Sequence, residues 1–275
     1  MSEREHGYAR YRLDGCRCYV CGFARAVYDE RRQRAIAYGT WQPFVDAEPV
    51  RQHVRDLQAC GVGLRRIAEA AQVDRKRLQA LLNGRPERGT GPQEKIRPAL
   101  ALAILAVEPS FDLLGDKTVI DASGTRRRLQ ALVARGWSQA KLAARLGWTP
   151  ANLGTLMKEP RTIVATARKV RALYDELWNQ APPEADHREK IAASRARNHA
   201  AANGWLPPQA WDDDLIDVPD DQLDAELARR VCAMDDDELR ACSTARYTHG
   251  DLSPLTVAGA REYRHRRKAQ TQGAA

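Results

Sequence analysis

Two stretches of the sequence decide the fold: VRQHVRDLQACGVGLRRIAEAAQVDRKRLQALLNG at residues 50–84 and TRRRLQALVARGWSQAKLAARLGWTPANLGTLMKE at residues 125–159. They align without a gap when the chain is shifted by 75 residues. The matched pairs include Leu57 with Leu132, Gly61 with Gly136, Ile67 with Leu142, Ala68 with Ala143, Leu78 with Leu153 and Leu81 with Leu156. Similarity at a fixed internal period indicates a duplicated structural unit.

Each copy predicts three short helices, whose ends are marked by capping residues. Glycine ends the first helix because it adopts the left-handed conformation readily. Short polar side chains precede the later helices, and proline opens the third helix of the second copy. These residues are Gly61, Asp74, Gly136, Ser138, Thr149 and Pro150. The order helix, tight turn, helix predicts a helix-turn-helix. We therefore expect an all-α protein with two tandem helix-turn-helix domains, each followed by a further helix, at residues 94–107 and 164–179.

Both copies also resemble known DNA-binding families. The run from Ile67 to Arg85, with its closing Leu-Asn-Gly, resembles the headpiece of lac repressor-type regulators. The run from Trp137 to Gly147 resembles the second helix of phage lambda repressor and Cro-type proteins. The first copy departs from this pattern at residues 75–77, Arg-Lys-Arg, where such families often carry Ser or Thr. The resemblance implies a regulator of double-stranded DNA whose third helix enters the major groove.

The expected DNA contacts follow from position within each copy. Outward residues early in the third helix reach base edges, where Arg and Lys suit guanine and Asn and Gln suit adenine. Residues that open the second helix usually meet phosphates. In the first copy these residues are Arg65, Arg66, Arg75, Lys76, Arg77, Gln79 and Asn83, and in the second they are Ser138, Gln139, Lys141, Ala151, Asn152, Thr155 and Lys158. The third helix of the second copy is less basic, so that copy is the candidate for a packing module if only one reads DNA.

Charge supports a polyanionic partner. The chain carries 44 Lys and Arg against 36 Asp and Glu, a net charge of +8. The surplus lies in residues 1–211, with 35 basic and 22 acidic residues, whereas residues 212–275 carry 9 and 14. A basic body of this kind suits nucleic acid, although an Arg- and Ala-rich composition is also typical of a GC-rich genome.

A cysteine cluster near the N-terminus indicates a metal site. The cluster consists of Cys16, Cys18 and Cys21. In a reducing compartment such spacing favours metal over a disulfide. A structural zinc takes four ligands, and His6 is the nearest candidate for the fourth; His53 and Cys60 are alternatives, although Cys60 is otherwise expected in a core. Free thiols and a redox or iron–sulfur role are the competing interpretations. The His-Gly…Cys-x-Cys-x-x-Cys opening resembles proteins of actinobacteria and actinophages.

We divide the chain as follows: 1–44, a Cys-rich zinc knuckle with a basic helix from about residue 22 to 38; 45–108, the first helix-turn-helix domain; 109–123, a linker; 124–182, the second domain; and 183–275, a C-terminal region that is partly helical and partly irregular. The last region is expected to hold a basic helix at 187–202, a Trp/Pro segment, a solvated acidic linker after Trp211, one or two helices at 222–242 and a basic tail at 261–268. That tail either touches phosphate or is disordered.

The leading interpretation is a sequence-specific transcriptional regulator, a repressor of phage or actinobacterial type. The alternative is an accessory or architectural factor for recombination, packaging or replication. No paired nucleophile and base, phosphate loop or carboxylate triad indicates an enzyme, and no small-molecule site is evident. The longest apolar run, Ala99–Val107, is far shorter than the ~20 residues of a membrane span, and no secretory signal is visible. We expect a cytoplasmic, nucleoid-associated protein that binds DNA as a monomer through two units or as a homodimer.

Overall fold

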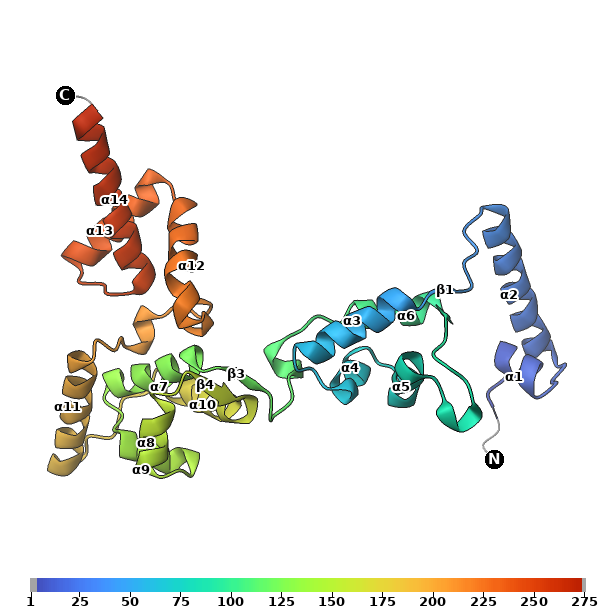
Figure 1. Cartoon of the computed structure of the whole chain (residues 1–275), viewed down its shortest axis with the longest axis horizontal. Coiled ribbons are helices and arrows are strands. Elements are labelled where there is room, and N and C mark those ends of the chain that lie inside the picture. The colour runs from blue at the N-terminus through green and yellow to red at the C-terminus, as the bar shows by residue number, and fades with distance from the viewer. Residues whose placement is uncertain (1–3, 274–275) are drawn as a thin grey trace. The chain divides into compact units, whose positions relative to one another are not determined.

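The computed structural model describes residues 4–273, and most of them lie in helices (Figure 1). The chain divides into two compact units, Met1–Leu114 and Gly115–Ala275, with a boundary inside the predicted linker. Among the described residues, every helix is too short or too polar to span a lipid bilayer. The prediction of a mostly helical chain is confirmed, whereas the short strands described below were not expected.

The first unit opens with a helical hairpin. Helices α1 (Tyr8–Leu13) and α2 (Tyr19–Ala37) are held together partly by the stacked rings of Tyr8 and Tyr28, whose centroids are 4.3 Å apart. Cys18 is the residue that precedes α2, so the helix begins three residues earlier than the sequence suggested. Cys21 is the one residue of α2 that is fully buried. The interior of this hairpin is therefore centred on the cysteine cluster.

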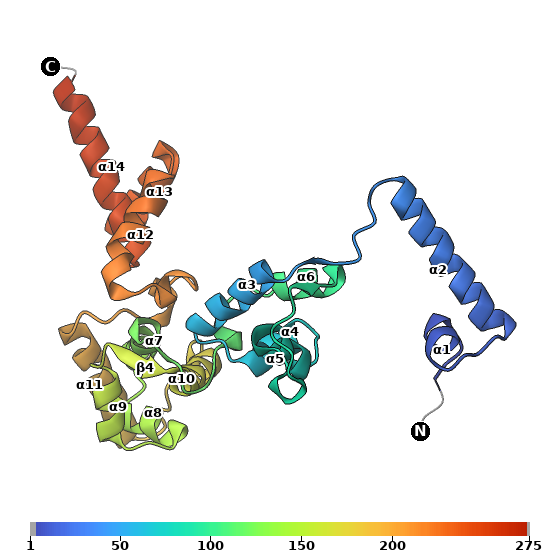
Figure 2. The same ribbon diagram turned by 45° about the vertical axis from the view of Figure 1, so that its right-hand side comes forward.

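The same order of elements then occurs twice, once in each unit (Figures 1 and 2). In the first unit it is β1 (Val45–Asp46), α3 (Glu48–Ala59), α4 (Leu64–Ala70), α5 (Arg75–Asn83), β2 (Lys95–Ile96) and α6 (Pro98–Leu105). In the second it is β3 (Val119–Asp121), α7 (Ser123–Arg135), α8 (Gln139–Leu146), α9 (Pro150–Leu156), β4 (Arg161–Ile163) and α10 (Val164–Leu177). In both copies the two strands pair antiparallel and bracket three helices.

The two copies bury corresponding side chains. Three matched pairs are at most 2% exposed: Leu57 with Leu132, Ile67 with Leu142, and Leu78 with Leu153. Each such side chain contributes about 1.5–3 kcal/mol by its burial. Ala68 and Ala143 are also buried, where a small side chain lets two helices approach closely. The repeated apolar pattern in the sequence therefore corresponds to two separate cores.

Polar contacts show that the repeat extends beyond the stretches that align. In the first copy the carboxylate of Asp46 accepts a hydrogen bond from the N–H of Glu48, and in the second Asp121 accepts one from Ser123, at 3.0 and 2.7 Å. Each of these aspartates ends a strand and fixes the start of the following helix. Because the two aspartates are also 75 residues apart, the strands belong to the duplicated unit.

An arginine of the first helix makes the second shared contact. The Arg51 guanidinium donates to the carbonyl oxygen of Gln93, and the Arg126 guanidinium donates to that of Glu159. In both copies the accepting residue lies shortly before the second strand. The side chain thus ties the first helix to the end of the unit, which local sequence signals do not reveal.

The tight turn between the second and third helices has the same backbone in both copies. Gln72 has φ 56° and is the only residue other than glycine with positive φ among those described; its counterpart Gly147 has φ 70°. A left-handed residue at this point reverses the chain after the second helix. The first copy therefore carries a conformational cost that the second avoids.

The C-terminal part of the second unit holds α11 (His187–Ala202), α12 (Asp220–Cys232), α13 (Asp236–Thr248) and α14 (Pro254–Gly273). Helix α11 packs on α7, and α14 lies beside both α12 and α13 (Figures 1 and 2). Two short 3₁₀ turns, Pro208–Ala210 and Leu215–Asp217, connect α11 to α12. Both turns contact α7, and we call residues 208–220 the strap.

The acidic segment after Trp211 is only partly the solvated linker that was expected: Asp212, Asp213 and Asp214 are exposed, but the residues after them pack on the protein. In the strap, Leu215 and Ile216 are 1% and 2% exposed. Asp217 pairs with Arg128 and Arg171, and Asp220 pairs with Arg126 and Arg127. Because Asp217 and Asp220 pair with guanidinium groups on α7 and α10, this part of the acidic segment packs on those helices.

Four further expectations are wrong. Residues 94–97 are not helical, because Pro98 restricts the residue before it to extended backbone. Residues 119–121 of the predicted linker form β3. Cys60 is exposed, since it lies just past the end of α3 instead of on its buried face. The alternative of a disordered tail at 261–268 is wrong, because this stretch is part of α14, which packs on α13, whereas its contact with phosphate stays a prediction.

Candidate metal centre and nucleic-acid interface

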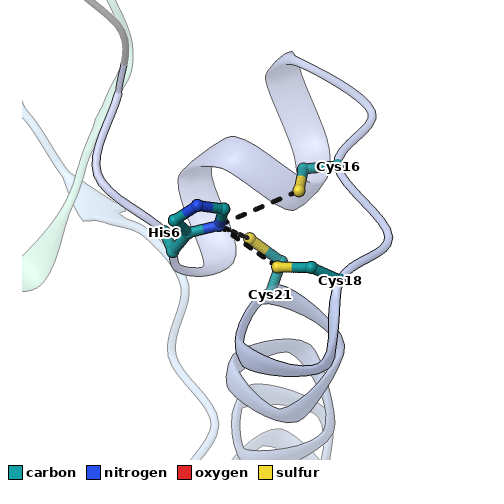
Figure 3. Close-up of side chains that lie close together, drawn as sticks. All are labelled: His6, Cys16, Cys18 and Cys21. Atoms are coloured by element: carbon teal, nitrogen blue, oxygen red, sulfur yellow. Dashed lines mark hydrogen bonds between the residues drawn. The ribbon is translucent and has the colours of Figure 1, made fainter.

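Four candidate metal ligands meet at the N-terminal hairpin. His6 precedes α1, Cys16 and Cys18 lie in the connection between the helices, and Cys21 lies in the first turn of α2. Their ligand atoms all lie within 4.8 Å of one another. Figure 3 shows the three sulfur atoms gathered around Nδ1 of the histidine ring. Of the two alternatives, the His53 ring faces the Val107 carbonyl oxygen at 3.0 Å, and Cys60 belongs to no group of candidate ligands in the described chain.

The distances fit a tetrahedral ion. Nδ1 of His6 lies 3.9 Å from Sγ of Cys16, 3.1 Å from Sγ of Cys18 and 3.5 Å from Sγ of Cys21. A zinc ion with Zn–S of about 2.3 Å and Zn–N of about 2.0–2.1 Å would set each of these separations near ~3.6 Å. The three measured values lie on both sides of it. Four nitrogen and sulfur ligands leave no open position, which is typical of a structural site.

The two cysteines nearest the start of α2 differ in how readily they form a thiolate. A hydrogen bond from the Cys21 backbone lowers the pKa of the Cys18 thiol to about 6. Burial raises the pKa of Cys21, although a backbone hydrogen bond from Gly7 opposes it. Backbone donors aimed at sulfur stabilise thiolates, which are the form that binds metal. The cluster could therefore hold a metal ion.

In the first unit, α5 presents a polar face. The Asp74 side chain accepts hydrogen bonds from the N–H groups of Lys76 and Arg77 and so fixes the start of the helix. The opposite side of α5 is anchored in the core by Leu78 and Leu81. The sequence-predicted contact residues on this helix are all exposed: Arg75, Lys76, Arg77, Gln79 and Asn83. Among them, Lys76, Gln79 and Asn83 line one groove and so share a face.

Charge on this part of the first unit is uncompensated. No acidic side chain in residues 4–273 pairs with Arg75, Lys76 or Arg77. Arg65 and Arg66, on the preceding α4, do pair with Glu69, at 2.8 and 3.5 Å. Those three side chains are largely exposed, so the pairs are weak and can exchange for phosphate. The α4–α5 pair therefore offers a net positive surface.

In the second unit, the basic residue near the start of the second helix is paired with an acid. Lys141, predicted to contact phosphate, donates to Glu189 of α11 at 2.9 Å, and this contact lowers the pKa of that carboxyl. Ser138 accepts a hydrogen bond from the N–H of Lys141, and Gln139 beside it is half-buried. The outward residues around α9 are exposed but nearly neutral: Ala151, Asn152, Thr155 and Lys158.

No family model, curated protein or solved structure matches the chain. The features of the chain that bear on its function are therefore the duplicated unit, the cysteine cluster and the distribution of charge.

Proposed function

We propose that the chain is a sequence-specific double-stranded DNA-binding protein, a transcriptional regulator of repressor type. In this proposal each three-helix unit is a helix-turn-helix, with α5 and α9 as the helices that face the major groove. The observation that carries the proposal is the α5 surface, where Lys76, Gln79 and Asn83 share one exposed face. Beside it lie Arg75 and Arg77, which pair with no carboxylate in the described part of the chain. Gln and Asn suit adenine, and Lys suits guanine or phosphate.

The two units contribute unequally in this proposal. The first unit supplies most of the affinity, because no carboxylate among residues 4–273 pairs with the cations of α5 and the ion pairs beside them are exchangeable. The second unit reads bases mainly through neutral groups such as Asn152 and Thr155, with Lys158 as the one cation among them, and its Lys141 is already paired. Two unlike units in one chain suit an asymmetric site read by a single molecule. Such binding would place the protein on the nucleoid.

We further propose that His6 and the three clustered cysteines hold a structural zinc ion. The ion would join the start of α2 to the residue that precedes α1 and so fix the N-terminal hairpin. The ion takes no part in DNA contact, because its four ligands all belong to the hairpin and leave no open position. Metal content of the purified chain, measured by mass spectrometry, tests this directly: one zinc per chain is expected, and none would overturn it.

The experiment that tests DNA binding is selection of sites from a random double-stranded pool by the full chain. It is repeated with Gln79→Ala and Asn152→Ala, which remove one exposed amide from each unit. A two-part motif, with one part relaxed by each variant, supports the proposal. Enrichment without any motif, combined with a steep loss of binding in salt, would instead indicate phosphate-dominated, architectural binding. Absence of enrichment would overturn DNA binding itself.

A further inference from the structure

A small hairpin follows α5 and has no counterpart in the second unit. The segment between the third helix and the second strand spans residues 84–94 in the first unit and only 157–160 in the second. The extra residues form a closed turn, in which Arg85 and Thr90 exchange backbone hydrogen bonds of 2.8 and 3.2 Å around the 3₁₀ turn Pro86–Arg88.

Gly84 fixes the hairpin against the end of α5. Its φ is 72°, and a Cβ at this position would lie 2.3 Å from the carbonyl oxygen of Thr90 and 2.4 Å from the carbonyl carbon of Gly91. Both neighbours are backbone atoms and cannot move without opening the turn. The hairpin is thus a defined element whose position is set by its contact with Gly84.

Between the hairpin and α5 lies a groove of about 550 Å³. One wall carries Lys76, Gln79 and Asn83 of α5, and the other carries Arg85 and Arg88 of the hairpin. Glu87 is the one acidic residue on the groove, so its lining has a positive balance. In the described chain, neither Arg85 nor Arg88 pairs with a carboxylate.

We propose that the hairpin wall of this groove meets the sugar–phosphate backbone of one DNA strand, with Arg85 and Arg88 as phosphate contacts, while the α5 wall faces the base edges. The inference rests on the proposed function, because it takes α5 as the helix in the major groove. A helix in that groove is flanked by both backbones, and an element that follows it at once meets the nearer one. Guanidinium groups suit phosphate because of their planar fork of donors. Phosphate contacts position the protein and carry no base preference.

The test measures binding of labelled duplexes by fluorescence anisotropy over a range of salt concentrations. The duplexes carry either the selected motif or a scrambled sequence of the same composition. The double variant Arg85→Ala/Arg88→Ala is expected to lower the magnitude of the log affinity against log salt slope by about 1.8, and the affinity by about 30-fold at ~0.15 M salt, equally on both duplexes. A loss confined to the motif duplex would show base reading and overturn the backbone assignment.

Two controls make the result specific. Arg188→Ala/Arg195→Ala removes the same charge from exposed positions on α11 and is expected to leave the slope unchanged; an equal drop would overturn the local assignment. Glu87→Gln, which removes the acid from the groove, is expected to raise the affinity for both duplexes, and a fall would count against the proposal. Circular dichroism verifies that each variant is folded.

Failure of this inference is distinguishable from failure of the proposed function. If Gln79→Ala weakens binding to the motif but the double arginine variant leaves slope and affinity unchanged, the groove proposal is overturned and DNA reading by α5 stands. If the unaltered chain binds neither duplex, the proposed function itself fails.

Discussion

Replacement of Arg127 by Met should weaken the attachment of the strap to α7. The guanidinium of Arg127 is 5% exposed and donates to the carbonyl oxygens of Leu215 and Ile216, at 3.1 and 3.2 Å, and to that of Val218. It also lies 5.0 Å from the centre of the Trp211 ring. Methionine keeps much of the side-chain volume and removes every donor.

The expected loss follows from the groups left without a partner. The Leu215 carbonyl keeps a hydrogen bond from the N–H of Val218. Asp220 keeps its ion pair with Arg126. The carbonyls of Ile216 and Val218, both in the strap, lose the donor that Arg127 provides, at about 1–3 kcal/mol each when buried. We therefore expect a loss of about 3 kcal/mol, in the range known for broken buried pairs.

Tryptophan fluorescence during urea unfolding is a suitable assay, because the second unit holds most of the chain's tryptophans. They are Trp137, Trp148, Trp178, Trp205 and Trp211, whereas Trp41 belongs to the first unit. With a slope near ~2 kcal/mol per molar urea, the midpoint should fall by about 1.5 M.

The control for this experiment is Arg240→Met, which breaks an exposed pair with Asp237 and should cost under ~0.5 kcal/mol. Equal midpoints for Arg127→Met and Arg240→Met would refute the reasoning, because they would show that the strap is not held by the buried guanidinium.

Three further predictions concern the metal site, pH and the turn. Cys16→Ser should lower the zinc content of the purified chain, measured by mass spectrometry, whereas Cys60→Ser should not change it. Although burial acts to raise the pKa of Asp217, contacts with Arg128 and Arg171 hold it below the ordinary value. The stabilisation from this carboxylate is therefore complete above the unfolded pKa of about 3.9 and is lost as pH falls through the folded pKa. Acid titration followed by tryptophan fluorescence should show a smaller dependence of stability on pH in Asp217→Asn. Gly147→Ala should cost about 1 kcal/mol in thermal unfolding, since φ is positive and no neighbour crowds the added Cβ; no change would contradict the shared turn.

Features set by a few adjacent residues could be predicted from the sequence. Asp74, Ser138 and Thr149 cap the helices they were expected to cap, and Gly136 ends α7 with a positive φ. The meeting of His6 with the cysteine cluster was also predicted, because short spacing limits where these side chains can go. These signals act within one or two turns of chain, so one sequence suffices to read them.

Features set by distant contacts could not be predicted. The strands that bracket each unit are two or three residues long and depend on partners about 40–50 residues away, as in the pairing of Val45 with Ile96. The docking of Asp217 onto Arg128 joins residues 89 positions apart. The hairpin at Arg85 and Thr90 depends on a close backbone approach to Gly84 that composition alone does not indicate.

The central claim is that α5 reads bases, and the affinity of the full chain for single-base variants of its selected duplex tests it most directly. The unaltered protein should discriminate by about 5- to 150-fold at the position that Gln79 contacts. Gln79→Ala should bind all four bases at that position alike and keep its discrimination elsewhere. If Gln79→Ala retains the full base preference at every position, α5 does not read the sequence and the account is contradicted.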